Sequence, residues 1–481
     1  MLPELASADM PERTQSFWRL AGPGVVLVGL SIGAGEIIIW PHIAAEFGGS
    51  MVWVAMVGVF LQFWVNLEIA RWTVATGETV YTGCARVWRG LAPVMILLIV
   101  LGYLAPGWAM ASGLALKGLL VGPEFGPATS GSAFAVLLGS QTFWTAVSFA
   151  GVAALLFGPK MMYQSMERVV ELLVVIVTVG LCIVAVAVGS AETWRELGSG
   201  LLNVTSFHIE EGISIRVLFS ALVFAGAGGT ANLFYSYYLR DKNIGMGGRL
   251  PTMMNPLRGR QETVPASGYR YPDNTKNSQR FRSWMDFVRK DQMIFFLGLN
   301  SLTILLFIFA SLAVLHPRGI VPDPNALIFD QAEILGQIWG GPGRVLFLII
   351  GMATLFSTQL VLVDGASRSL ADIVYTNFPA ARRRELSWWY LVFAGSWIVA
   401  GCAVTGVMES FQVTNLGFIF NAAYMGGFAM AIYVPVNLYM NIRYLPASAR
   451  PGVISILMGS IASLVYVGFA ISSILWELGV F

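Results

Sequence analysis

The residues best placed to do chemistry lie inside an apolar stretch, residues 22–49, whose centre holds Gly33, Gly35 and Glu36. A carboxylate at the depth of a bilayer costs roughly 2.5 to 3.5 kcal/mol unless it meets water, a cation or a partner. An interrupted helix survives there only where it faces protein or a water-filled cavity, because lipid cannot satisfy the freed backbone groups. The stretch is therefore a candidate binding site, with Glu36 as its main ligand. Alternatively, Glu36 caps the second half-helix or meets a basic residue from another segment.

A second glycine-rich stretch, residues 224–232, contains Gly226 and Thr230 as well as two further glycines. Glycine-interrupted spans in corresponding positions of two halves are typical of transporters built from inverted repeats. Glycine tolerates non-helical dihedral angles and lets a ligand approach the backbone, although small residues also occur at close helix contacts. We expect the first and sixth spans to be broken. The expected break positions are Gly33, Gly35, Gly228 and Gly229.

The composition indicates what kind of protein positions these stretches. The chain has 481 residues, of which 56% are hydrophobic and 12% are charged. This is too little charge to cover a soluble globule, and enough apolar sequence for many spans of about 20 residues. We predict an all-α polytopic membrane protein with about eleven transmembrane helices. The predicted spans are approximately 21–47, 50–76, 91–121, 139–157, 168–190, 214–239, 291–315, 343–374, 387–408, 411–440 and 452–476.

The distribution of positive charge predicts the orientation. With the N-terminus in the cytoplasm, the basic loops lie on the inside, as the positive-inside rule requires. The most basic of them is segment 240–290, whose Gly, Pro and Asn content predicts a poorly ordered cytoplasmic loop. The net charge of +2 gives no indication of nucleic-acid binding. We expect a multi-pass protein of the cell membrane, a monomer whose macromolecular surroundings are the lipid bilayer.

Polar residues inside the eighth span suggest a second interior position. Thr354, Ser357 and Thr358 form a polar run and are a candidate second cation site. Asp364 precedes Arg368 by one helical turn, which favours an intrahelical ion pair.

Other polar or reactive residues give less information. Asn421 in the tenth span either hydrogen-bonds across the bundle or lines a pathway. Cys84, Cys182 and Cys402 show no metal-ligand spacing. The sequence has no phosphate-binding loop and no zinc-binding His pair, so we do not expect an enzyme, nor a cofactor besides a transported cation.

Four short segments form a recognisable set: Gly22-Pro23-Gly24 followed by the first break, Ala70-Arg71 to Thr76-Gly77-Glu78, Tyr163 to Glu167, and Asn232-Leu233-Phe234. With these segments the chain resembles the Nramp family of divalent metal transporters. The likeness is strong in the first two spans and weaker later. It implies a LeuT-type fold, with two five-helix inverted repeats within 1–190 and 214–440, an extra helix at 452–476, and one transporter domain over 1–481.

The departures from the Nramp pattern suggest a rebuilt site. Gly33 stands where the family has its metal-binding Asp, Glu36 where it has its metal-binding Asn, and Gly229 where it has a Met. Asn421 stands near the family's tenth-helix Gln. The acidic, histidine and arginine residues associated with proton movement in the family are missing, so we expect no proton coupling of the usual kind. The site residues that this alignment implies are Glu36, Gly33, Gly226, Gly229, Thr230 and Asn421.

The rebuilt site suits a hard cation. Without the thioether, the remaining ligands are a carboxylate and neutral oxygens, which favour Mg²⁺ or Mn²⁺ over softer metals. The glycines are expected to leave room for the waters that Mg²⁺ retains. The alternative is a sodium-coupled carrier of a small organic solute on the same fold, in which half-helix N-termini bind a carboxylate. Glu36 argues against an anionic solute, because its fixed negative charge would repel it.

Overall fold

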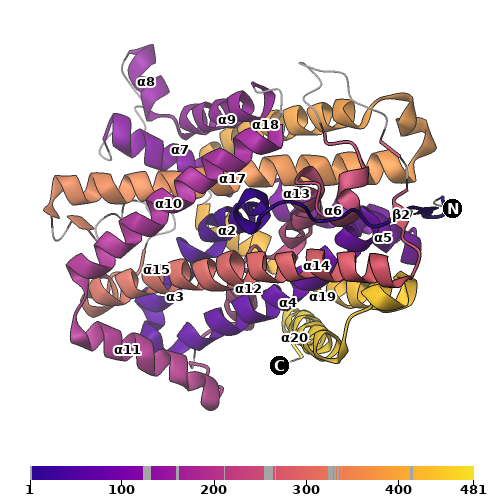
Figure 1. Ribbon diagram of the computed structural model, residues 1–481. Coiled ribbons are helices and arrows are strands. Elements are labelled where there is room, and N and C mark those ends of the chain that lie inside the picture. The colour runs from indigo at the N-terminus through magenta and orange to yellow at the C-terminus, as the bar shows by residue number, and fades with distance from the viewer. Residues whose placement is uncertain are drawn as a thin grey trace.

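The computed structural model describes most of the chain and shows a helical bundle (Figure 1). Two short parallel strands, β1 (Ala6–Ser7) and β2 (Tyr269–Arg270), pair Ala6 with Tyr269 and Ser7 with Arg270. They tie the N-terminal segment to the loop before the seventh span. The described residues are 3–122, 132–158, 162–210, 212–253, 264–265, 267–322, 329, 332, 335–336, 339–411 and 415–480.

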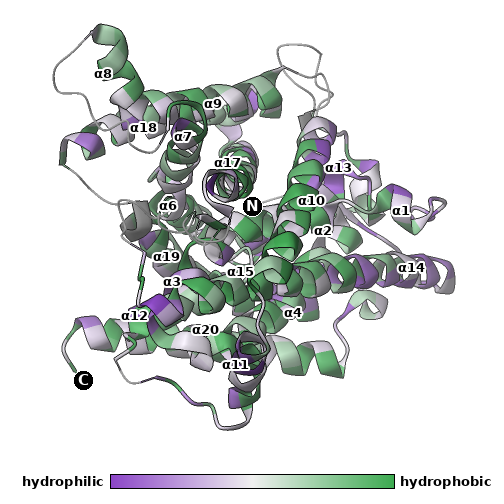
Figure 2. Ribbon diagram, turned by 90° about the vertical axis from the view of Figure 1, so that its left-hand side faces the viewer, coloured by the Kyte–Doolittle hydropathy of each residue, from purple (hydrophilic) through white to green (hydrophobic). Residues whose placement is uncertain are grey.

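Long apolar helices make up most of the bundle. Within the described ranges, eight helical segments are long and apolar enough to cross a membrane, and a ninth is formed by a pair bent by 70°. Figure 2 shows most of these helices as predominantly hydrophobic, whereas α14 (Thr275–Asp291) is largely hydrophilic. They comprise the segment Ile39–Thr76, which joins α3 (Ile39–Phe47) and η2 (Gly48–Met51) to α4 (Val52–Thr76), α6 (Leu91–Tyr103) with α7 (Gly107–Leu120), the bent pair α8 (Ala133–Gly139) and α9 (Gln141–Phe157), α10 (Met162–Val188), α14 with η6 (Gln292–Leu299) and α15 (Asn300–Val314), α17 (Gly341–Asn377), α18 (Leu386–Phe411), α19 (Asn415–Tyr444) and α20 (Val453–Glu477).

Two further spans are interrupted, and each of their half-helices is too short to cross a membrane by itself. The first consists of α2 (Pro23–Ser31), the π-helical turn η1 (Ile32–Glu36) and α3 (Ile39–Phe47). The sixth consists of α12 (Ile215–Val223), an irregular stretch, the 3-10 helix η4 (Gly229–Phe234) and α13 (Tyr235–Asp241). If α3 is assigned to the first span and α4 alone is kept from the segment Ile39–Thr76, these two spans and the nine segments give eleven in the described part of the chain. The predicted breaks in spans 1 and 6 are confirmed.

The two breaks differ in form. In the sixth span, Gly228 and Gly229 have φ angles of +69° and +56°, which side chains other than glycine rarely tolerate. In the first span, the chain widens into a π turn without leaving the helical region, and the amide of Ile37 bonds to the carbonyl of Ile32 at 3.3 Å. π turns of this kind occur often at functional sites.

The segment predicted as a poorly ordered loop contains a helix. Residues 275–291 form α14, which leads through η6 into the seventh span. The side chain of Asn274 caps it by accepting from the amide of Asn277 at 2.9 Å. The loop prediction is wrong here because the basic residues occupy one face of a helix whose other face is apolar at helical spacing. The buried apolar residues are Phe281, Trp284, Met285, Phe287 and Val288.

The two ends of the bundle carry different short elements. Figure 1 places the N-terminus, β2 and α5 (Val80–Val87) at one end, with α8 and α11 (Ala191–Leu202) at the other. The remaining short elements are α1 (Phe17–Leu20), η2 (Gly48–Met51), η3 (Asn203–Thr205), η5 (Gly245–Arg249), η7 (His316–Arg318), η8 (Pro379–Arg383) and η9 (Ala447–Ala449).

Candidate functional site

Glu36 ends the π turn and is completely buried. Neither of its carboxylate oxygens has a hydrogen-bond partner in the described structure. The Thr303 side chain on α15 is close enough to interact, but its hydroxyl lies against the carbonyls of Leu299 and Asn300, at 3.1 Å from each. A buried, unpaired carboxylate is among the most costly groups in a membrane protein. Within the described residues, the Glu36 side chain therefore neither caps the second half-helix nor pairs with a basic residue, the two alternatives that the sequence left open.

Two residues of α15 connect the first break to the second. Thr303 lies beside Glu36. One turn earlier, the side-chain amide group of Asn300 donates to the carbonyl of Ala225 at 3.0 Å. The side-chain oxygen of Asn300 is buried and has no partner among the described residues. Carboxylate, hydroxyl and amide oxygens thus lie along one contact between η1, α15 and the irregular stretch of span 6.

The glycines of the first break serve close packing. A Cβ on Gly33 would overlap the hydroxyl of Thr358 and come within 2.6 Å of the carbonyl oxygen of Thr354. A Cβ on Gly35 would overlap the carbonyl of Phe224, so this glycine brings the two breaks into direct contact. The space that an Asp side chain would need at Gly33 is therefore filled by α17.

The glycines of the second break are packed as tightly. A Cβ on Gly226 would lie 2.5 Å from the side-chain oxygen of Gln62, and one on Gly229 would lie 2.8 Å from the Tyr103 hydroxyl. The expectation that the glycines leave room for retained waters is wrong in this conformation. Neighbouring side chains and backbone groups occupy the space beside these glycines.

Gln62, in the middle of α4, holds the second break in place. Its amide group donates to the carbonyls of Leu222 and Val223 at 3.3 and 2.8 Å. Its oxygen accepts from the amide of Gly228 and from the side chain of Asn232, both at 3.1 Å. One buried side chain thus satisfies backbone groups on both sides of the interruption, which lipid could not do.

Three aromatic side chains satisfy further freed backbone groups. The Tyr103 hydroxyl donates to the carbonyl of Gly228 at 3.2 Å and accepts from the amide of Ala231 at 3.1 Å. Tyr81 donates to the carbonyl of Thr230 at 3.2 Å, and Trp108 donates to that of Gly33 at 2.8 Å. The sequence analysis did not single out these residues or Gln62. Gln62 did carry a signal, since it is an amide inside an otherwise apolar run.

The candidate second cation site lies where α17 crosses α2. Ser357 donates to the carbonyl of Gly29 at 3.1 Å, and Thr358 donates to those of Gly29 and Leu30 at 3.1 and 3.0 Å. The carbonyl of Thr354 is 2.8 Å from the Ser357 hydroxyl. Hydroxyl and carbonyl oxygens of the two helices therefore lie together, and a cation site at these side chains stays a prediction.

The structure brings most of the remaining site residues together, with one exception. Thr230 is buried in the second break, and its hydroxyl has no partner among the residues described. Asn421 is exposed and accepts a hydrogen bond from Arg216, so it stands apart from the breaks. Across the described ranges, no group of three or more His, Cys, Asp or Glu side chains could hold a metal ion. Glu36 is the acidic side chain within the π turn of the first span.

Asp364 and Arg368 form the ion pair expected within the eighth span. Their side chains are 2.8 Å apart, and both are buried. Arg368 also pairs with Asp241 at the end of α13, and Tyr390 donates to Asp364 at 2.8 Å. The network joins three spans at a distance from the breaks, so it is structural in this conformation.

Solved structures share this arrangement of helices. A mutant of the manganese transporter from Eremococcus coleocola matches with a TM-score of 0.70 and 16% identity, over 98% of this chain and 90% of that one. The same transporter with an aromatic bis-isothiourea-substituted compound gives 0.68 and 15%, over 98% and 90%. MhsT in complex with L-phenylalanine gives 0.52 and 15%, over 95% and 99%. The chain has the LeuT-type transporter fold.

The LeuT-type fold confirms the fold class that the resemblance to the Nramp family predicted, whereas the bounds of the two repeats stay a prediction. At identities near 16%, the likeness concerns the arrangement of helices and does not extend to the ligands. No family model and no curated protein matches the chain. The residues of the site must therefore be interpreted from their own contacts.

Proposed function

We propose that this protein carries a divalent metal cation across a membrane, with Glu36 as the principal charged ligand. The observation that carries the proposal is the complete burial of Glu36, with neither oxygen paired in the described structure. Such a carboxylate requires a positive charge or a proton. Its place at the break of span 1, on a fold shared with a manganese transporter, favours a transported cation.

The donor set favours a hard cation, Mg²⁺ or Mn²⁺. The hydroxyl of Thr303 lies beside Glu36, and Asn300 offers an unpaired amide oxygen one turn earlier on α15. The second break offers the hydroxyl of Thr230, which is unpaired among the described residues. All are oxygen ligands, which hard cations prefer. Because one carboxylate leaves one positive charge of a divalent ion uncompensated, we expect weak binding and fast release. We further propose that transport proceeds without the proton coupling usual in Nramp proteins.

Uptake of Mg²⁺ and Mn²⁺ into proteoliposomes tests the role of Glu36. Glu36→Gln keeps the volume and one oxygen but removes the charge. We expect uptake to fall by about tenfold or more, since hydrogen bonds and contacts to a charged group are worth about 1.5 to 3 kcal/mol. Glu36→Asp should retain part of the activity. The matched control is Glu46→Gln, on the same half-span but 47% exposed, which should transport as the wild type does.

The outcomes separate a ligand from a structural group. Wild-type uptake by a folded Glu36→Gln protein would refute the proposal, and monodisperse elution in detergent would establish that the variant folds. A pH-sensitive dye inside the same vesicles reports on coupling. Acidification in step with metal uptake at a fixed membrane potential would contradict the proposed absence of proton flux.

The alternative function, sodium-coupled transport of a small organic solute, has one observation in its favour. The oxygens contributed by Gly29, Leu30, Ser357 and Thr358 converge between the first and eighth spans, and sodium prefers such neutral oxygens. MhsT, which was solved with L-phenylalanine, shares the fold. Under this alternative, sodium alone should change the fluorescence of Trp108, and Glu36→Gln should leave metal binding unaffected because there is none.

A further inference from the structure

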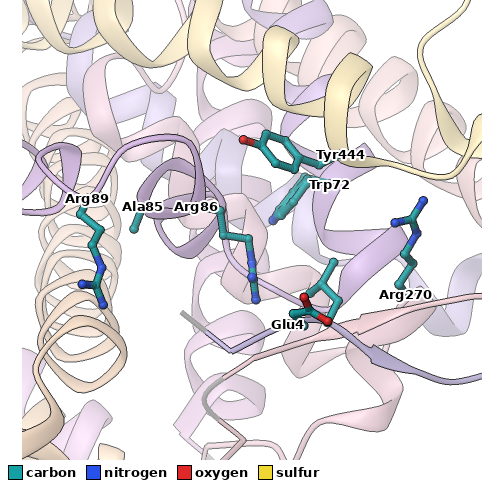
Figure 3. Close-up of a pocket in the computed structure, with 8 residues that line it drawn as sticks. Glu4, Trp72, Ala85, Arg86, Arg89, Arg270 and Tyr444 are labelled. Carbon is teal, nitrogen blue, oxygen red and sulfur yellow. The ribbon is translucent and has the colours of Figure 1, made fainter. Parts of the chain in front are cut away.

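A cavity of 490 Å³ opens at the end of the bundle that holds the N-terminus (Figure 3). Its walls come from the N-terminal segment, α5, the loop after α5, β2 and the last turns of α4 and α19. The side chains that matter are Glu4, Trp72, Arg86, Arg89, Arg270 and Tyr444. A second cavity of 470 Å³ shares Leu5 and Arg270 with it and adds Arg450. Neither cavity borders the candidate transport site.

The guanidinium groups of the cavity differ in what they already bind. Arg86 is held by Glu78 and donates to the carbonyl of Pro3 at 2.8 Å, so it shapes the wall. Arg89 and Arg270 make no ion pair or side-chain hydrogen bond in the described part of the chain, and Arg270 is exposed. Asp273 lies close enough to Arg270 to interact with it electrostatically. Of these two guanidinium groups, Arg89 alone has no charged partner among the described residues.

One carboxylate lies among these arginines. Figure 3 shows Glu4 between Arg86 and Arg270, yet it makes no ion pair with either in the described structure. Glu4 stands just before β1, on a segment attached to β2 through the Ala6–Tyr269 pairing. An incoming anion with more negative charge and more acceptor oxygens would compete effectively with this single carboxylate.

The floor of the cavity is aromatic and holds an unused donor. Trp72 and Tyr444 lie next to each other in Figure 3. Trp72 is fully buried, and its indole N–H has no partner among the described groups. Trp and Tyr at the ends of spans mark the level of the lipid headgroups. The cavity thus combines guanidinium groups, a buried donor without a partner and an aromatic surface at the membrane interface.

We propose that this cavity binds the phosphate group of an anionic phospholipid headgroup. Guanidinium groups bind phosphate through paired hydrogen bonds, and basic pockets between membrane helices bind anionic headgroups. Arg270 holds the phosphate, and Arg89 adds positive charge from the opposite side of the opening (Figure 3). Tyr444 contacts the glycerol region, and Glu4 is displaced. The lipid thereby fixes the N-terminal segment against α4 and α19. This site is independent of the identity of the transported substrate.

Thermal unfolding of the full-length protein in a neutral detergent tests the proposal. The probes are short-chain phosphatidylglycerol, short-chain phosphatidylcholine and inorganic phosphate. We expect phosphatidylglycerol to raise the melting temperature, and the double variant Arg89→Gln, Arg270→Gln to weaken its apparent affinity by about fivefold for each lost charge. Lys276→Gln, an exposed basic residue at the same end, is the matched control and should change little. Glu4→Gln should tighten binding, because it removes the competing carboxylate.

Each outcome decides the matter. A phosphatidylglycerol shift that is unchanged in the double variant, or equal for phosphatidylcholine, would overturn the site. An equal shift with inorganic phosphate at the same concentration would overturn the lipid assignment in favour of a soluble phosphate. Glu4→Gln is expected to raise the apparent affinity for phosphatidylglycerol, and the arginine variants to lower it. A general destabilisation of the protein would lower the affinity in both cases, so the opposite effects rule it out.

Discussion

Replacing Gln62 tests the physical account of the second break. Gln62→Leu keeps the approximate volume in α4 and removes four hydrogen bonds, three of them to the freed backbone of Leu222, Val223 and Gly228. A net hydrogen bond is worth about 1 kcal/mol, and a buried group left unpaired costs about 1 to 3 kcal/mol. The free energy of unfolding should therefore fall by about 4 kcal/mol.

The assay is the melting temperature of the detergent-solubilised protein, followed by uptake in proteoliposomes. A loss of this size corresponds to a decrease of roughly 5 to 10 °C. The matched control is Gln359→Leu, another buried amide, which loses a single hydrogen bond from Ser148. It should cost about 1 kcal/mol or less. If Gln62→Leu melts no lower than Gln359→Leu, the break does not depend on this side chain, and the reasoning is refuted.

Three other predictions concern packing, the buried ion network and orientation. Gly33→Asp, which introduces the Nramp residue, should lower the melting temperature and fail to raise uptake, because its Cβ would overlap Thr358. Higher uptake would show that α17 can shift to make room for the side chain. Asp241→Asn should destabilise by about 3 kcal/mol or more, since it weakens a buried pair with Arg368, and a melting temperature within a degree of the wild type would contradict this. Lys276→Cys should react with an impermeant thiol reagent only when the reagent has access to the cytoplasmic side of the membrane. Labelling of intact cells from outside would contradict the predicted orientation.

Several properties of the protein follow from the sequence alone. The high apolar content, the spacing of the spans and the glycine-rich interruptions are encoded by residues close together in the chain. These features predicted an all-α membrane protein with two broken spans, and the structure confirms both. Glu36 could be selected in the same way, because an acid inside an apolar run is costly wherever the helices pack.

Other properties depend on contacts between distant segments. The helix at residues 275–291 was missed because its apolar face is stabilised by packing on α4 and on the N-terminal segment. The amide of Met10 donates to the side chain of Asn277, and the indole of Trp284 donates to the carbonyl of Pro11. Asn421 was placed by alignment in the central site, whereas its side chain meets Arg216, which lies 205 residues earlier in the chain.

The glycines show most clearly what the tertiary structure decides. Their sequence pattern allowed both a space for ligand or water and a close contact between helices. Gly35 touches Phe224, and Gly226 touches Gln62, so the partners lie more than 150 residues away. Backbone flexibility at a glycine is a local property that the sequence contains. Whether the space beside it is filled depends on which distant side chain the fold brings there, and only the packed structure determines that.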